Sequence, residues 1–363
     1  MKQHGEQEPQ VVDLTGDGVP ELIAISTVIS VFGCVNGSYQ ILGEFQDEAM
    51  FPLPPRLVAI KDLNADGIPE LVIRNAAFHR ESWVRVIGWD GKSFRDLLPE
   101  DNYSEQSDRT NLVFSWYGDY FIFWMIEPKI AFKDLGHNGV PEIIISGGIN
   151  MWYECRFGPW RDKSLIYAWN GSMFDLSGLE LTPPSYRFQA VQDADRAALM
   201  ENYTKALDLY QQVISNDQLK EWSPDNYNKQ DWTCRLDTKD WPTPTPFPID
   251  FHEYPNLAAY ARYRMLLLHA VMGQAKAAEV DYNLLVHNYP SGKDGFVYAE
   301  LASAFWQNYQ ASKNIQSACQ QAIQFAGNNE HEVFYYVGNI DNEENWHGEQ
   351  SHQYEPEDVC PFQ

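Results

Sequence analysis

The chain has 363 residues, which at roughly 150 residues per domain predicts two or three domains. Its 51 acidic residues outnumber 26 Lys and Arg, giving a formal net charge of -25, and this charge argues against binding to nucleic acid or to anionic lipid. Hydrophobic residues make up 44% of the chain and aromatic residues 14%, which excludes a disordered polypeptide. No apolar run approaches the length that would insert into a membrane.

Three segments in the first half of the chain repeat one pattern. They are VVDLTGDGVPELIAIS from Val11, AIKDLNADGIPELVIRN from Ala59 and AFKDLGHNGVPEIIISG from Ala131. Each combines an apolar strand, an acidic loop with a central glycine, a Pro-Glu pair and a second apolar strand. An Asn-Gly or Asp-Gly pair follows each segment, and such pairs favour two-residue hairpin turns. These pairs begin at Asn36, Asp90 and Asn170. Each repeat is therefore predicted to form about four strands.

The acidic loops have the spacing of a calcium-binding loop. Side-chain oxygens at positions 1, 3 and 5, a backbone carbonyl at 7 and a carboxylate at 9 can surround one ion, and glycine at 6 permits the bend. The second loop has the complete set, namely Asp62, Asn64, Asp66, the Ile68 carbonyl and Glu70. The first loop has Asp13, Thr15, Asp17, the Val19 carbonyl and Glu21. The third has Asp134, Asn138, the Val140 carbonyl and Glu142.

The three loops differ in how well they match this ligand set. A threonine hydroxyl at Thr15 weakens the first loop, and Gly136 supplies no side-chain oxygen at position 3 of the third. Calcium is therefore expected foremost in the second loop, then in the first, and least in the third, which approaches a plain turn. The alternative is that all three are turns held by hydrogen bonds from side chains to backbone.

The segment DLNADGIPEL and its two relatives resemble the FG-GAP or VCBS-type repeats of integrin-like β-propellers and of many secreted bacterial proteins. The resemblance covers residues 8–182. It implies a propeller-like antiparallel β-repeat domain in which calcium has a structural role. A closed propeller needs four to eight blades. Three visible repeats imply either a longer full-length protein or an open, irregular stack.

Two aromatic-rich insertions interrupt the β-repeats, at residues 111–126 and 151–163. Both are rich in tryptophan and tyrosine and could form a surface that binds a sugar or a peptide. The alternative is that these side chains fill the core or shield sheet edges. The sequence does not isolate a solvent-facing stripe that would decide between these two interpretations.

Residues 185–327 change to a helical period and resemble a short array of degenerate tetratricopeptide-like helix pairs. The spacing of small and apolar residues carries this resemblance, at Gly273, Ala278, Tyr282, Leu285 and Pro290, at Ala206, Tyr210 and Val213, and at Ala318 and Ala322. A proline-rich insertion at 218–255 is predicted to be an extended surface excursion. The overall expectation is an α+β multidomain protein in which a β-repeat region precedes a helical repeat array.

The five cysteines, Cys34, Cys155, Cys234, Cys319 and Cys360, are too widely spaced for a CxxC zinc site. Either they are buried or free thiols, or one or two disulfides form in an oxidising compartment. The acidic C-terminal tail, residues 328–363, ends in apolar residues and is expected to pack back onto the helices. A disulfide from Cys360 to Cys319 would fasten it, with Cys234 as the alternative partner.

Motifs of an enzyme active site do not occur in the sequence. The close pair His347 and His352 is a weak candidate for a metal site. We therefore expect a non-enzymatic binding or assembly module, extracellular or on the cell surface, with structural calcium and a protein or glycan partner. The alternative is a carbohydrate-active enzyme or glycan-binding protein that uses the aromatic insertions at 111–126 and 151–163.

Overall fold

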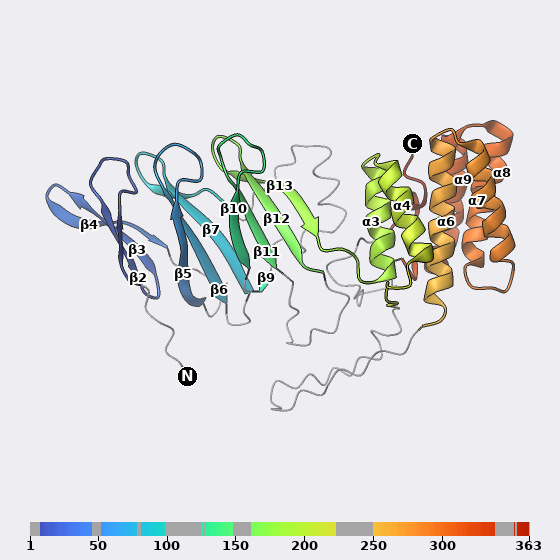
Figure 1. The fold of residues 1–363 in the computed structure, drawn as a ribbon, viewed down its shortest axis with the longest axis horizontal. Helices are drawn as coiled ribbons and strands as arrows, with labels where there is room; N and C mark the ends of the chain where they lie inside the picture. The colour runs from blue at the N-terminus through green and yellow to red at the C-terminus, as the bar shows by residue number, and fades with distance from the viewer. Residues whose placement is uncertain are drawn as a thin grey trace, which may run out of the picture. The chain divides into compact units, whose positions relative to one another are not determined.

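A computed structural model describes residues 8–45, 52–77, 81–98, 125–126, 128–147, 161–222, 250–337, 352 and 354–362. Within these residues the chain is an α+β protein with three antiparallel sheets followed by seven helices (Figure 1). The described chain divides into two compact units, a β unit that ends at Thr182 and a helical unit that begins at Pro183.

Each sequence repeat forms one sheet whose strands pair in chain order. The first sheet contains β1 (Gln10–Val12), β2 (Glu21–Ile25), β3 (Ile29–Val35) and β4 (Ser38–Phe45). The second contains β5 (Pro52–Lys61), β6 (Glu70–Ala77), β7 (Glu81–Trp89) and β8 (Phe94–Asp96), and β9 (Met125–Ile126) pairs with β7. The third contains β10 (Lys129–Lys133), β11 (Glu142–Gly147), β12 (Lys163–Trp169) and β13 (Phe174–Leu181). The prediction of about four strands per repeat is confirmed, and the described strands do not close into a barrel or propeller.

Only one of the three predicted two-residue hairpin turns has the expected form. Asn36 and Gly37 both have positive φ, 53° and 78°, and join β3 directly to β4. The turns that begin at Asp90 and Asn170 span four residues instead. In each, the side-chain oxygen of the first residue accepts backbone N–H groups two and three positions later. This side-chain capping holds the longer loop and removes the need for positive φ at the first position.

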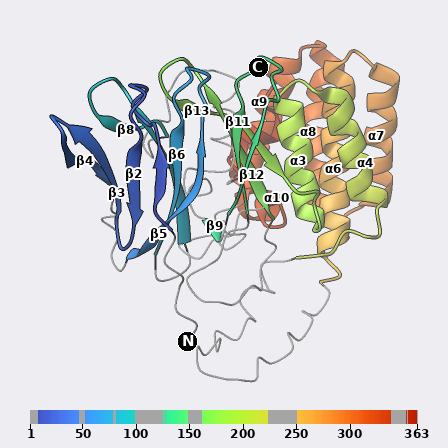
Figure 2. The ribbon, with the colours of Figure 1, turned by 60° about the vertical axis from the view of Figure 1, so that its left-hand side comes forward.

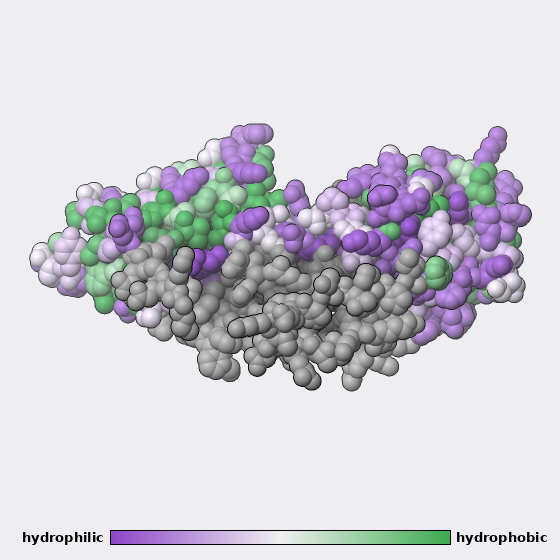
Figure 3. Space-filling model, turned by 60° about the horizontal axis from the view of Figure 1, so that its bottom comes forward, coloured by the Kyte–Doolittle hydropathy of each residue, from purple (hydrophilic) through white to green (hydrophobic). Residues whose placement is uncertain are grey.

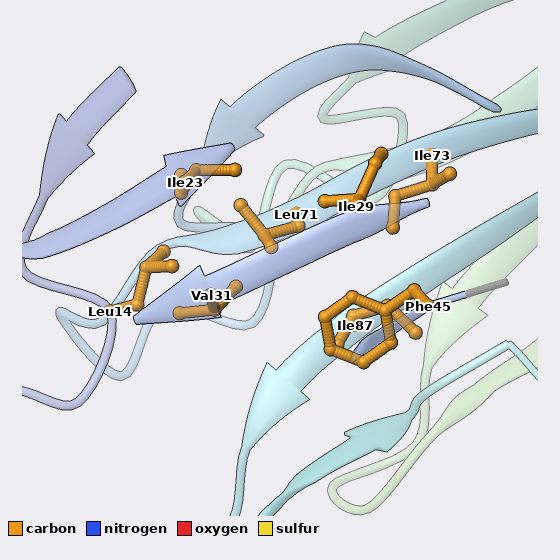
Figure 4. Close-up of a cluster of buried hydrophobic side chains, with 8 residues drawn as sticks. All are labelled: Leu14, Ile23, Ile29, Val31, Phe45, Leu71, Ile73 and Ile87. Atoms are coloured by element: carbon orange, nitrogen blue, oxygen red, sulfur yellow. The ribbon is translucent and has the colours of Figure 1, made fainter. Parts of the chain in front are cut away.

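The sheets of the β unit pack face to face along the chain (Figures 1 and 2). Eight buried side chains from the first and second sheets form the core between them (Figure 4). They are Leu14, Ile23, Ile29, Val31, Phe45, Leu71, Ile73 and Ile87. The second and third sheets also meet, since the Phe174 N–H donates to the Leu97 carbonyl at 2.7 Å and the Lys61 ammonium lies 5.3 Å from the centre of the Phe132 ring.

Helices that are adjacent in sequence pack as pairs in the helical unit (Figure 2). The helices are α3 (Arg187–Leu199), α4 (Tyr203–Ser215), α6 (Glu253–Val271), α7 (Ala275–Asn288), α8 (Phe296–Ser312), α9 (Ile315–Asn328) and α10 (Glu330–Phe334). The small residues Ala206, Ala278 and Ala318 have no exposed surface, as close helix packing requires. None of the described helices has the length and apolar character to span a membrane.

The structure corrects the ends of two predicted segments. The proline-rich insertion was predicted to extend to residue 255, but α6 begins at Glu253 and includes Pro255. Proline is tolerated there because the first-turn N–H groups of a helix have no partner within the helix. Helical structure also continues past residue 327, since α9 ends at Asn328 and α10 follows it.

The C-terminal segment packs back onto the helices of its own unit. A disulfide joins Cys319 in α9 to Cys360, and the hydroxyl of Tyr263 in α6 donates to the Val359 carbonyl at 3.0 Å. Val359 and Cys360 have no exposed surface. The predicted tail docking and the Cys319 disulfide are therefore confirmed. Among the described cysteines only Cys34 is free, and it is exposed.

Candidate functional site

The three acidic loops of the β unit share one pattern of hydrogen bonds. In each, the glutamate at position 9 accepts the backbone N–H of the leucine at position 2. The N–H to oxygen distances are 2.7 Å for Leu14 and Glu21, 2.7 Å for Leu63 and Glu70, and 2.6 Å for Leu135 and Glu142. The glutamate therefore fastens the start of the loop to the first residue of the strand that follows it.

The aspartate at position 1 and the side chain at position 5 organise the rest of the loop. Both carboxylate oxygens of Asp62 accept backbone N–H groups, from Ala65 at 2.8 Å and from Gly67 at 3.0 Å. Asp13 accepts N–H groups at the same two positions, from Gly16 and Gly18. Asp134 accepts them from Asn138 and Gly139, at positions 5 and 6. The position 5 side chains then accept the N–H of position 7, in the pairs Asp17 with Val19, Asp66 with Ile68, and Asn138 with Val140.

The loop backbone has positive φ, the left-handed conformation, at positions 4 and 6. The sequence indicated only position 6, through its glycine. Glycine at position 6 has φ between 83° and 89° in all three loops. Position 4 is also left-handed, but it is occupied by Gly16, Ala65 or His137, with φ of 73°, 63° and 53°. Because these three residues share no chemistry, only the glycine of the first loop could have signalled this conformation.

The second loop gathers negative charge around a buried carboxylate. Glu70 is 2% exposed, and burial together with the carboxylates of Asp66 and Asp62 raises the pKa of Glu70 to about 7. The side-chain amide of Asn64 donates to a carboxylate oxygen of Asp66 at 3.0 Å. An ionised carboxylate that is buried beside two others is costly unless a cation compensates it.

The first loop has the same arrangement in a weaker form. Glu21 is also 2% exposed, and its pKa is raised by burial and by the carboxylates of Asp13 and Asp17. The Thr15 hydroxyl lies 3.4 Å from a carboxylate oxygen of Glu21, so it shares the site with the acidic side chains. This loop therefore offers three carboxylates and one hydroxyl.

The third loop keeps the backbone and loses part of the ligand set. Asp134 and Asn138 are exposed and Glu142 is partly exposed, while position 5 carries an amide instead of a carboxylate. A Cβ added to Gly136 would lie 3.2 Å from a carboxylate oxygen of Glu142, so position 3 faces the site but contributes no oxygen.

The donor chemistry of the second loop fits calcium, which prefers carboxylate, amide and carbonyl oxygens. Asp62, Asn64, Asp66, Glu70 and the Ile68 carbonyl would supply such a set, and the buried charge on Glu70 is the feature that a cation would relieve. In the arrangement that the structure describes, the carboxylates accept backbone N–H groups. Among the described residues no three His, Cys, Asp or Glu side chains converge into a metal-holding group.

A buried polar cluster in the helical unit was not predicted. Asp195 accepts hydroxyl hydrogen bonds from Tyr210, from Tyr260 at 3.0 Å and from Tyr354 at 2.6 Å, and it pairs with Arg264 at 2.9 Å. The Asp195 and Arg264 side chains are each 1% exposed. The cluster joins α3, α4, α6 and the C-terminal segment through these contacts. It is enclosed, so it is not accessible to a substrate. Only an Asp inside an Ala-rich helical run, ADRAA, could have signalled it.

The two aromatic insertions and the pair His347 and His352 are the remaining predicted candidates. The aromatic insertions at 111–126 and 151–163 lie almost wholly outside the residues whose side chains are described, as does His347. His352 is described, and its ring nitrogen lies 2.8 Å from a carboxylate oxygen of Asp358 in the docked C-terminal segment. No protein-family model, curated protein sequence or solved structure matches this chain.

Proposed function

We propose that the chain is a non-enzymatic binding or assembly module whose β-repeats are stabilised by calcium, as in the FG-GAP or VCBS-type repeats that they resemble. The observation that carries this proposal is the second loop, where the buried Glu70 lies beside Asp62 and Asp66 on a backbone that recurs in all three repeats. On this proposal the three loops form a series, with the second loop as the strongest site and the third as the weakest.

The proposed role of the loop residues follows from their place between strands. Asp62 lies directly after β5 and Glu70 is the first residue of β6, so ligands from both strands would hold one ion at the end of a hairpin. A bound calcium ion supplies positive charge that neutralises these carboxylates. A ligand bound only by the folded state at a hundredfold excess over its Kd stabilises that state by about 2.7 kcal/mol.

The proposed location is extracellular or on the cell surface. The disulfide between Cys319 and Cys360 supports it, because disulfides form and persist mainly in oxidising compartments. The paired helices support a role as a scaffold of tetratricopeptide-like type, since stacked helix pairs present extended binding surfaces. A glycan-directed function would rest on the aromatic insertions, which lie almost wholly outside the residues whose side chains are described.

Thermal unfolding with calcium and with a chelator tests the calcium proposal. Wild-type protein is expected to melt at a higher temperature in millimolar calcium. Asp66→Asn removes one carboxylate but retains an oxygen that can accept the Ile68 N–H, so it should abolish most of the calcium-dependent rise. Asp90→Asn is the matched control, because Asp90, like Asp66, accepts backbone N–H in a β loop but lies outside the acidic loops.

Two results would contradict the proposal. Identical wild-type melting curves in calcium and in chelator would mean that calcium does not stabilise the β unit. A calcium-dependent rise that Asp66→Asn leaves intact would place the ion elsewhere in the protein.

A further inference from the structure

The first two acidic loops contact each other through Gly16 and Ile68. A Cβ atom built on Gly16 would lie 2.7 Å from Cδ1 of Ile68 and 3.0 Å from its Cγ1. Both distances are too short for ordinary contacts between carbon atoms, which are about 3.5–4.0 Å. The Ile68 side chain therefore occupies the space that a larger residue in place of Gly16 would need. Glycine lets the second loop pack directly on the backbone of the first.

The contact joins two residues that hold the proposed ligand sets. Gly16 is position 4 of the first loop, between the ligand positions 3 and 5, and its N–H donates to the carboxylate of Asp13 at 2.7 Å. Ile68 is position 7 of the second loop, where its carbonyl is the expected ligand, and its N–H donates to Asp66 at 2.8 Å. A shift of either residue would therefore displace ligands of its own loop.

The buried core links the same two loops a second time. Leu14 follows Asp13 in the first loop, and Leu71 follows Glu70 at the end of the second. Leu14 and Leu71 have no exposed surface and belong to one cluster of buried side chains (Figure 4). Because protein cores are closely packed, this cluster holds the two loops in a fixed relation and keeps Ile68 against Gly16.

The equivalent residue of the first loop has a different environment. Val19 is position 7 of that loop and is 44% exposed, whereas Ile68 is partly buried. In the view of Figure 3, hydrophobic residues gather over the described part of the β unit, whereas hydrophilic residues cover most of the described helical unit. An exposed apolar side chain such as Val19 is therefore not unusual in the β unit. Val19 shares the backbone role of Ile68 without its burial, which makes it an internal control.

We infer that Ile68 couples calcium binding in the first two loops, with its carbonyl as a ligand of the second loop and its side chain as a positioning residue of the first. An ion in the second loop would restrict the Ile68 backbone and hold the side chain against Gly16. The backbone of the first loop would then be ordered before its own ion arrives, so binding there would lose less conformational entropy. By linkage, an ion in the first loop strengthens binding in the second by the same factor. This coupling rests on the proposed function, because it requires calcium in both loops.

Electrostatic repulsion between the two ions opposes this coupling. Each of the two loops contributes three carboxylates, and an ion in one loop reduces the attraction that the ion of the other loop experiences. Salt screens this repulsion, because the Debye length is only about 4 Å at about 0.5 M ionic strength. The packing of Ile68 on Gly16 does not depend on salt in this way. The positive coupling should therefore be clearest at high salt concentration.

Isothermal titration of the full chain with calcium in about 0.5 M NaCl tests the coupling. Wild-type protein should bind two ions in two steps, the second loop first. Asp66→Asn weakens the second loop and leaves the step of the first loop alone. That step should be about five- to tenfold weaker than the second step of wild type, because the second loop is then empty.

Ile68→Ala separates the side chain from the carbonyl. The variant keeps the carbonyl ligand, so the first step should be unchanged, whereas the second step should weaken about five- to tenfold. Asp66→Asn added to Ile68→Ala should weaken the first loop no further, since the coupling is already lost. The matched control is Val19→Ala, which also keeps a position 7 carbonyl and should leave both steps within about twofold of wild type.

A milder variant keeps the test independent of folding. Ile68→Val removes the Cδ1 atom that lies nearest to Gly16 and introduces the residue that the other two loops have at position 7. It should weaken the second step at least about twofold. Circular dichroism and melting in chelator confirm that each variant is folded.

Three results would overturn the coupling. The first is a first-loop step in Asp66→Asn that equals the second step of wild type, and the second is a second step that Ile68→Ala leaves unchanged. In either case two ions still bind to wild type, so the proposed function stands and only the coupling fails. The third is a wild-type chain that binds no calcium, which contradicts the proposed function as well.

Discussion

The second and third acidic loops have the same backbone but different chemistry. In both, the position 1 aspartate accepts backbone N–H groups from the loop and the position 9 glutamate accepts the N–H of a leucine. Glu70 is 2% exposed and has two carboxylates beside it, whereas Glu142 is partly exposed and has an amide at position 5. Hydrogen bonds and glycine are therefore sufficient to form the loop. Buried charge is the property that distinguishes a candidate calcium site from a turn.

The largest expected effect concerns the charge on Glu70. Its pKa of about 7 lies above the ordinary value of 4.5, so the folded state disfavours the ionised form. Without calcium, the contribution of Glu70 to stability should be most favourable below pH about 4.5 and should fall by roughly 2–3 kcal/mol as the pH rises to about 7. Glu70→Gln should remove this loss, so in chelator above pH 7 the variant should be more stable than wild type. Denaturant unfolding at several pH values measures the difference.

Calcium should reverse the sign of this effect. In calcium, Glu70→Gln lacks one ligand and should be less stable than wild type. The control is Glu142→Gln, which should change stability by less than about 0.5 kcal/mol in either condition because Glu142 is partly exposed. Equal effects of the two substitutions would show that burial does not separate the second loop from the third.

A smaller effect is expected from restoring the ligand set of the third loop. Gly136→Asp combined with Asn138→Asp supplies carboxylates at positions 3 and 5, and the first of these lies near a carboxylate oxygen of Glu142. Stability in chelator should fall by about 1 kcal/mol through repulsion, and calcium at a hundredfold excess over its Kd should restore about 2.7 kcal/mol. Isothermal titration calorimetry should detect one additional ion per chain.

Gly136→Ala is the control for this graft. It adds a Cβ at the same place without a ligand oxygen, so it should bind no additional ion. A double variant with unchanged calcium stoichiometry would mean that exposure of the third loop, and not only its missing carboxylates, prevents binding.

The smallest expected effect concerns the left-handed position that the loops share. Ala65 has φ of 63°, and the first loop has Gly16 at the equivalent position. Ala65→Gly should stabilise the second loop by about 0.5–1 kcal/mol, because relief of left-handed strain exceeds the entropic cost of glycine. Gly16→Ala should destabilise, since its Cβ would lie 2.7 Å from the Ile68 side chain. Denaturant midpoints of the two variants check the opposite signs.

Local patterns in the sequence determined the segmentation of this protein. The repeated Asp-to-Glu spacing marked the three loops. Apolar stretches and Asn-Gly or Asp-Gly pairs predicted about four strands per repeat, because strand and turn chemistry depend on neighbours in the chain. The spacing of small residues such as Ala206 and Ala318 likewise predicted the helix pairs, and both residues are buried. The Cys319 to Cys360 disulfide followed from an apolar chain end close to a helix that carries a cysteine.

Tertiary structure decided which of these equivalent residues are covered. Leu22, Leu71 and Ile143 occupy the same position in their repeats, yet only Leu22 is exposed. Leu71 is buried in the core that the first and second sheets share. Glu70 and Glu142 occupy the same position in their repeats, yet Glu70 is 2% exposed and Glu142 is partly exposed. The pairing of Asp195 with Arg264 joins residues from α3 and α6, far apart in the chain. Burial depends on contacts between distant segments, and no local pattern records those contacts.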